Sequence, residues 1–280
     1  MARRRGMPAF PKLGDFIPGD SLNTPRITVV GSYATGLTVK AARIPGAGET
    51  LLGSGYRVDF GGKGSNQAVG CARLGAQVSF VAKIGSDSFG DMALRLYREE
   101  GIDADHVMRS ADAPTGVGFI VVEEGSGQNC IVLDPGANEL LKPEDVAGAE
   151  VALNSASVVL TQLEIPVEAA ASALECGRKA GAITILNPAP VRPLPAAILG
   201  LVDVLTPNET EARVLVGRPA HSDARPEDVA QDLIRLGVKQ VVMTLGENGA
   251  LLFTASARKL FRAVQVRAVD TTGAGDAFNA

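Results

Sequence analysis

Short apolar runs alternate with amphipathic stretches through most of the chain. The runs predict buried strands of a mostly parallel sheet. They lie at residues 27–30, 78–81, 158–160, 183–186, 202–205 and 241–244. This alternation is typical of an α/β domain with helices on both faces of the sheet.

The stretches between the strands predict helices, because start and stop residues bracket them. Ser65 is expected to cap a helix that ends at Gly75, and Asp87 to cap one that stops at Gly101. Further helices are expected from Pro166 to Gly181 and from Pro226 to Gly237.

Two stretches break the alternation. Residues 33–60 carry apolar positions and many glycines but no helix cap, and residues 115–133 are typical of a hairpin that turns at 123–127. These strands precede the regular region, so they could form a small sheet of their own.

Composition and charge narrow the class of protein. The 280 residues are 46% hydrophobic, enough for the core of one large domain. A net charge of −4 argues against binding to nucleic acid or a membrane surface, and the absence of Trp argues against base-stacking platforms. Three separated cysteines fit a reducing cytoplasm. Residues 1–25, with Arg3, Arg4, Arg5 and several prolines, are expected to be a disordered extension.

The C-terminal end holds the most informative chemistry. Residues 264–270 alternate as a strand, a Gly273-Ala274-Gly275 turn follows, and Asp276 is expected to open a helix. Bare amides at a helix start can bind an anion, and a carboxylate beside them can accept a proton. The alternative is an ordinary strand–turn–helix with Asp276 as its cap.

Two further segments carry candidate chemistry. Gly61-Gly62-Lys63-Gly64-Ser65-Asn66 combines glycines at a turn with an amide in the next helix. Asn208 and Glu211 share one face of a helix start, where they could order Mg²⁺ or form a capping box. The sequence has neither a Walker loop nor G-x-G-x-x-G, so the 273–275 turn is the best candidate for holding phosphate.

In order and spacing, these segments resemble the ribokinase-like sugar kinases (the phosphofructokinase B family), as does Asn187-Pro188-Ala189-Pro190. The resemblance covers about residues 26–280 and implies one kinase domain. Its fold would be an α/β three-layer sandwich with a central, mostly parallel sheet and a β-lid within 33–60 and 115–133. The family uses this lid to cover the sugar and often to dimerise. The resemblance also implies further C-terminal helices after residue 280, so the chain looks truncated.

The resemblance assigns a role to each matching residue. It implies that Asp276 is the base and that Gly273, Ala274 and Gly275 form the anion hole. The sugar side would comprise Gly61, Gly62, Asn66 and Glu164, together with Asp276. The nucleotide side would comprise Asn187, Asn208, Thr244 and Gly246. The metal side would comprise Glu211 for Mg²⁺, and Asp270 and Thr272 for part of a monovalent-cation loop that could hold K⁺.

The implied activity is ATP- and Mg²⁺-dependent phosphorylation of a primary hydroxyl on ribose or a related small sugar, by a homodimer joined through the lid. Ribokinases usually carry G-S-x-N-x-D after the first strand, whereas this chain has Ala34 and Gly36 at the two polar positions. The loss of both anchors puts ribose in doubt, since hydroxyl recognition discriminates strongly. A nucleoside kinase on the same fold and a non-catalytic sugar- or nucleotide-binding protein are the alternatives.

Overall fold

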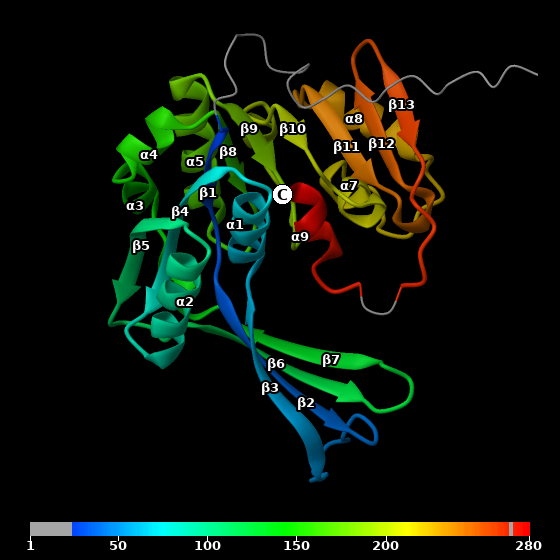
Figure 1. Ribbon diagram of the computed structural model, residues 1–280. Coiled ribbons are helices and arrows are strands. Elements are labelled where there is room, and N and C mark those ends of the chain that lie inside the picture. Colours follow the sequence, from blue (N-terminus) through cyan, green and yellow to red (C-terminus); the bar gives the residue numbers. More distant parts are fainter. Residues whose placement is uncertain (1–23, 269–270) are drawn as a thin grey trace, which may run out of the picture.

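Residues 24–268 and 271–280, which the computed structural model of the protein describes, contain two sheets (Figure 1). The larger has the order β13-β12-β11-β10-β9-β8-β1-β4-β5. Its strands are β1 (Arg26–Val30), β4 (Gln77–Gly85), β5 (Asp103–Ser110), β8 (Val158–Thr161), β9 (Ile183–Leu186), β10 (Val204–Leu205), β11 (Gln240–Thr244), β12 (Ala250–Thr254) and β13 (Arg258–Phe261). The pairs from β5 to β11 are parallel, and only the pairs that β12 forms with β11 and β13 are antiparallel. The predicted mostly parallel sheet is therefore confirmed.

Helices cover both faces of this sheet. They are α1 (Lys63–Arg73), α2 (Ser88–Glu99), α3 (Pro143–Ala147), α4 (Glu150–Ser155), α5 (Val167–Ala180), α6 (Ala196–Leu199), α7 (Glu209–Leu215), α8 (Pro226–Arg235) and α9 (Ala274–Asn279). Neighbouring strand residues join different cores: Val29 packs with α1 and α2, whereas Val30 packs with α3, α4 and α5. Such alternation means that the sheet is buried on both sides, as a three-layer sandwich requires.

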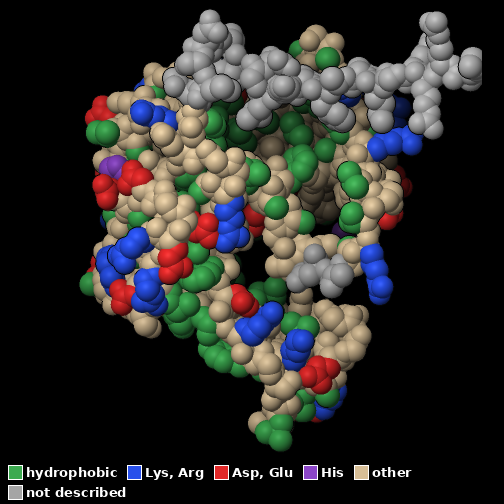
Figure 2. Space-filling model, in the orientation of Figure 1, with side chains coloured by type: hydrophobic (Ala, Val, Ile, Leu, Met, Phe, Trp, Pro, Cys, Tyr) green, Lys and Arg blue, Asp and Glu red, His purple; other side chains and the backbone are tan. Residues whose placement is uncertain are grey.

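The small sheet is a lid of four strands in the order β3-β2-β6-β7. Its strands are β2 (Ala34–Ala41), β3 (Gly53–Gly61), β6 (Gly116–Glu123) and β7 (Asn129–Asp134). It projects below the main body in Figure 1, and Figure 2 shows the molecule hollowed between the two. Buried Asn138 joins lid to body, since its side chain accepts from Tyr33 N at 2.9 Å and donates to Tyr33 O at 2.7 Å.

Most predicted helix ends are confirmed, but the Ser65 cap is wrong. Asp87 caps α2 by accepting from Gly90 N, and Gly181 ends α5 with φ 77°. The helix predicted to start at Ser65 begins at Lys63, with Gly62 as its N-cap. Ser65 lies inside it and is buried, and its hydroxyl accepts a hydrogen bond from Tyr97.

Two predicted strands also need correction. The run at 202–205 shortens to β10, because the Val202 amide donates to Leu199 O in the turn that leaves α6. Residues 264–268 of the predicted 264–270 strand form none, and Val264 and Val266 are exposed. The β12–β13 ladder ends where Phe261 pairs with Ala250, so the alternating residues after it lack a partner strand.

The last helix starts earlier than the sequence predicts. Gly273, with φ 73°, is the N-cap of α9, so Asp276 is the third helical residue and neither opens nor caps the helix.

Residues 1–23 of the predicted extension, and Asp270, lie outside the described residues. Among the helices that are described, none has the length and apolar character needed to cross a bilayer.

Candidate functional site

The end of β1 and the start of α1 touch backbone to backbone. A Cβ at Gly62 would lie 2.6 Å from Tyr33 Cα, and one at Gly64 would lie 2.5 Å from Ser32 N. Gly62 also has φ 88°, a conformation that side chains disfavour. Glycine at these positions therefore lets α1 begin directly against the loop after β1.

Glu164 stabilises the contact between α1 and the loop after β1. Its Oε2 accepts hydrogen bonds from Ser32 Oγ at 2.6 Å and from the Lys63 amide at 2.8 Å. The second bond satisfies one of the free amides at the start of α1. Glu164 is half-buried and bonds the amide that directly follows Gly61 and Gly62, two residues that the family resemblance assigns, like Glu164, to the sugar side.

Asp276 is a buried carboxylate held by α1. It is 6% exposed, and α9 packs against α1. Oδ2 accepts from Asn66 Nδ2 at 2.9 Å, and Oδ1 accepts from Gln67 Nε2 at 3.1 Å. Lys63 Nζ lies 4.0 Å from Oδ1. One short segment at the start of α1 thus supplies two amides and one cation to a carboxylate about two hundred residues later in the sequence.

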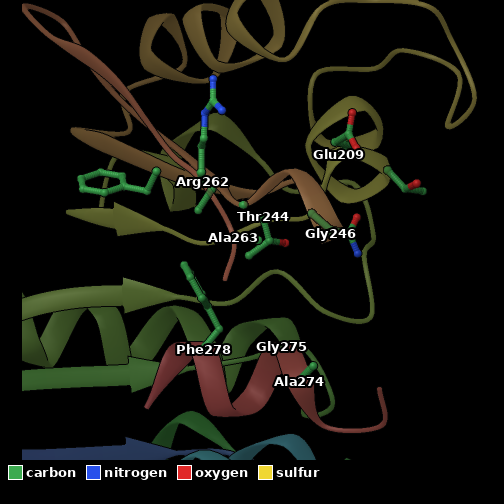
Figure 3. A pocket seen from close by; sticks show the side chains of 13 residues that line it. Glu209, Thr244, Gly246, Arg262, Ala263, Ala274, Gly275 and Phe278 are labelled. Atoms are coloured by element: carbon green, nitrogen blue, oxygen red, sulfur yellow. The ribbon is translucent and has the colours of Figure 1, made fainter. Parts of the chain in front are cut away.

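The other side of the same turn borders a cavity of about 560 Å³, a size that suits a small-molecule ligand. In Figure 3, Ala274 and Gly275 lie on the α9 wall, while Thr244 and Gly246 lie on the opposite wall at the end of β11. Asn208 lines it too. The cavity therefore gathers five of the predicted site residues, whereas Asp276, in the same first turn of α9, does not line it and contacts α1 instead.

Asn187 lies apart from Asn208, Thr244 and Gly246, the other residues predicted for the nucleotide side. It is buried and does not line the cavity. Its Oδ1 accepts from Gln67 Nε2 at 3.1 Å, and its Nδ2 donates to Thr206 O at 3.1 Å. It therefore lies behind the carboxylate of Asp276, within the same hydrogen-bond network.

Asn208 and Glu211 form the capping box that the sequence offered as one alternative. Asn208 Oδ1 accepts from Glu211 N and Glu211 Oε2 accepts from Asn208 N, both at 2.8 Å. Burial raises the pKa of the Glu211 carboxyl, and the Asn208 amide and the positive charge of Lys63 offset part of that rise. Lys63 thus acts electrostatically on both Glu211 and Asp276.

The structure describes only some of the residues that were predicted to bind metal ions. Within residues 24–268 and 271–280, no cluster of three His, Cys, Asp or Glu side chains is arranged to hold a metal ion. Thr272 is in the turn before α9, whereas Asp270 lies outside the described residues. The Mg²⁺ role of Glu211 and the monovalent-cation loop stay predictions.

Sequence reasoning missed several residues at the site. Lys63 had no assigned role, and Gln67 was not singled out although it directly follows Asn66. Two more residues line the cavity without any recognisable motif: Phe261, the last residue of the exposed strand β13, and Arg262, which follows it. Only the fold, which brings β13 against the α9 turn, identifies them.

Comparison with known proteins gives one consistent result. The model of the "pfkB family carbohydrate kinase" matches residues 24–280. A ribokinase of Staphylococcus aureus (strain COL) is 38% identical, over 91% of this chain and 84% of its own length. A deoxyribokinase of Salmonella typhi is 37% identical, over 90% and 82%. The structure of an Arabidopsis thaliana ribokinase with ribose and ATP superposes with a TM-score of 0.81 at 32% identity, over 91% and 83%.

The raised pKa of Glu211 predicts a pH-dependent difference in stability. A carboxyl whose pKa is higher in the folded state favours folding while protonated, and that contribution is lost as pH rises from its ordinary value of 4.5 through the folded pKa. Gln cannot ionise and keeps the acceptor for the Asn208 amide. Glu211→Gln should therefore gain stability relative to the wild type as pH rises above about 4.5.

Urea unfolding at several pH values measures this difference. Glu247→Gln, at an exposed position, is the control and should show no such trend. A Glu211→Gln protein that loses stability at neutral pH would contradict the burial argument.

Proposed function

Because the chain belongs to the pfkB family of carbohydrate kinases, we propose that it transfers the γ-phosphoryl group of ATP to the primary hydroxyl of ribose or a closely related small sugar. One observation carries the proposal: the buried carboxylate of Asp276 and the cavity lie on opposite sides of one helical turn. The named substrates of the similar proteins support the choice of a pentose and ATP.

In this reaction, ATP occupies the cavity with its γ-phosphate over the turn Gly273–Gly275. The backbone amides of the turn receive the developing phosphate charge. Asp276 accepts the proton of the sugar hydroxyl as the new bond forms. Phosphoryl transfer depends mainly on positioning and charge neutralisation, so a base and an anion-binding turn within four residues suit it.

Magnesium, when bound, neutralises charge on the phosphate oxygens. We assign Glu211 to the ion or its waters, through Oε1, because Oε2 accepts the Asn208 amide. Carboxylate oxygens are ligands that Mg²⁺ favours. Lys63 lies at 4.0 Å from Asp276 and is suited to compensate charge between the two carboxylates.

A carboxylate from the neighbouring lid strand adjoins the place of a missing sugar anchor. Gly36 pairs with Asp59 across β2 and β3, and directly opposed residues share a face of the sheet. A Cβ at Gly36 would lie 3.8 Å from Asp59 Cβ, in ordinary contact. We propose that Asp59 accepts the hydroxyl hydrogen bond that a side chain at position 36 cannot make.

We also propose a homodimer joined through the lid. Val58, Leu37, Phe119 and Val132 pair across all four lid strands and form one apolar row. Phe119 is 53% exposed and Val132 is 63% exposed, so the row lacks cover within one described chain.

We infer a cytoplasmic location, consistent with three free cysteines.

Asp276→Asn should lower kcat by about 10²- to 10⁴-fold while sugar binding persists, because it removes the base but keeps the shape. A coupled ADP-release assay with ribose, 2-deoxyribose and nucleosides measures this, together with calorimetric sugar titration. Retention of more than about a tenth of the wild-type kcat would rule out general-base catalysis. Preference for nucleosides would favour the nucleoside kinase, and ligand binding without turnover by the wild type would favour a binding protein.

Asp59→Ala should raise the KM for the sugar about 10- to 100-fold and leave the KM for ATP within about twofold, because a hydrogen bond to a charged group is lost on the sugar side only. Steady-state kinetics measures both values, with the sugar varied at saturating ATP and ATP varied at saturating sugar. Glu123→Ala, at the far end of β6, is the matched lid control. An unchanged KM for the sugar would show that other residues anchor its hydroxyls.

Phe119→Asp should convert a dimer into a monomer, because it places a charge in the centre of the apolar row. Sedimentation equilibrium gives the mass of each species. Leu260→Asp, at an exposed position on β13, is the control and should leave the mass unchanged. A wild-type protein that sediments as a monomer at micromolar concentration would contradict the dimer.

A further inference from the structure

In the network around Asp276, the buried side chain of Gln67 is the one whose hydrogen-bonding groups are most fully used. It is 0% exposed. Its Nε2 donates to Asp276 Oδ1 and to Asn187 Oδ1, both at 3.1 Å. Its Oε1 accepts from Gln162 Nε2 at 2.6 Å. Both amide hydrogens and the carbonyl oxygen are therefore used inside the protein.

Two groups that can only accept hydrogen bonds fix the direction of this network. The Thr206 carbonyl requires Asn187 to present Nδ2 to it, which turns Asn187 Oδ1 toward Gln67. The ionised Asp276 carboxylate requires the NH₂ group of Gln67 as well. Both demands are met by one orientation of the Gln67 amide, with Nε2 toward Asp276 and Asn187.

Asn66 and Gln67 hold the carboxylate differently. Asn66 is partly exposed and bonds Oδ2, so a sugar hydroxyl can replace it there. Gln67 bonds Oδ1 from the interior, where a substrate does not reach. The hydrogen bond from Gln67 can therefore persist when the sugar binds. It prevents the carboxylate of Asp276 from rotating about the Cβ–Cγ bond.

We propose that Gln67 is a positioning residue that acts through Asp276, holding Oδ1 from the interior so that Oδ2 is aimed at the sugar hydroxyl. The proposal rests on the proposed function, in which Asp276 is the base. Displacement of a reacting group by about 1 Å can cost about 10²-fold in rate. The orienting bond should thus affect the rate of the chemical step and leave substrate binding nearly unchanged.

Gln67→Met tests the proposal in the intact protein with its described fold, since Met has similar volume and no amide. We expect kcat to fall about 10- to 100-fold, with the KM values for sugar and ATP changed less than about threefold. Thr184→Val is the control for stability. It removes a buried hydroxyl that bonds Leu201 O and Asp203, remote from the site, and should lower the melting temperature without lowering kcat.

A double-mutant cycle separates positioning from a purely structural role. If Gln67 acts through Asp276, then Gln67→Met should change the residual single-turnover rate of Asp276→Asn by less than about twofold. Gln67→Asn, which withdraws the amide by one methylene, provides the same comparison should the Met protein not fold.

The outcomes are distinct. A wild type without sugar kinase activity overturns the proposed function and this inference with it. An active wild type overturns this inference alone if Gln67→Met keeps its kcat while its melting temperature falls. So does a cycle in which the effects of the two substitutions multiply.

Discussion

The site depends on the burial of one carboxylate. Asp276 is almost inaccessible to solvent, and an ionised carboxylate in that position is costly unless donors surround it. Asn66 and Gln67 are those donors, Lys63 adds a positive charge 4.0 Å away, and all three belong to the first two turns of α1. The start of α1 must therefore be placed accurately against α9, although the two helices are about two hundred residues apart in sequence.

The rest of the fold provides that placement. Glycines allow α1 to begin in contact with the loop after β1, and Glu164 ties the same point to the end of β8. The strand ends of a parallel sheet meet at one edge, where open α/β proteins bind ligands. At this edge the first turn of α9 borders the cavity with Ala274 and Gly275 and holds Asp276 on its other side, against α1. A phosphate donor and an alcohol acceptor can therefore meet across a single turn.

The sequence pattern predicted those elements whose formation depends on residues close together in the chain. The β–α alternation, the ends of α2, α5 and α8, and the hairpin of β6 and β7 depend on periodicity, caps and turns within a few residues. The predicted strand at 264–270 failed because alternation does not reveal whether a partner strand exists. The Ser65 cap failed because the helix start is set by contact with the loop after β1. The roles proposed for Asp59 and Gln67 were not predicted from the sequence, since they rest on pairing across strands and on contact between distant helices.

The central claim is that the Asp276 carboxylate receives the proton of the sugar's primary hydroxyl. A crystal structure with the sugar and a non-hydrolysable ATP analogue tests it most directly. The account predicts that the primary hydroxyl oxygen lies about 2.6–3.2 Å from one carboxylate oxygen of Asp276, in line with the γ-phosphorus over the Gly273–Gly275 turn. A sugar bound with another hydroxyl at Asp276, or with none near it, would contradict the account.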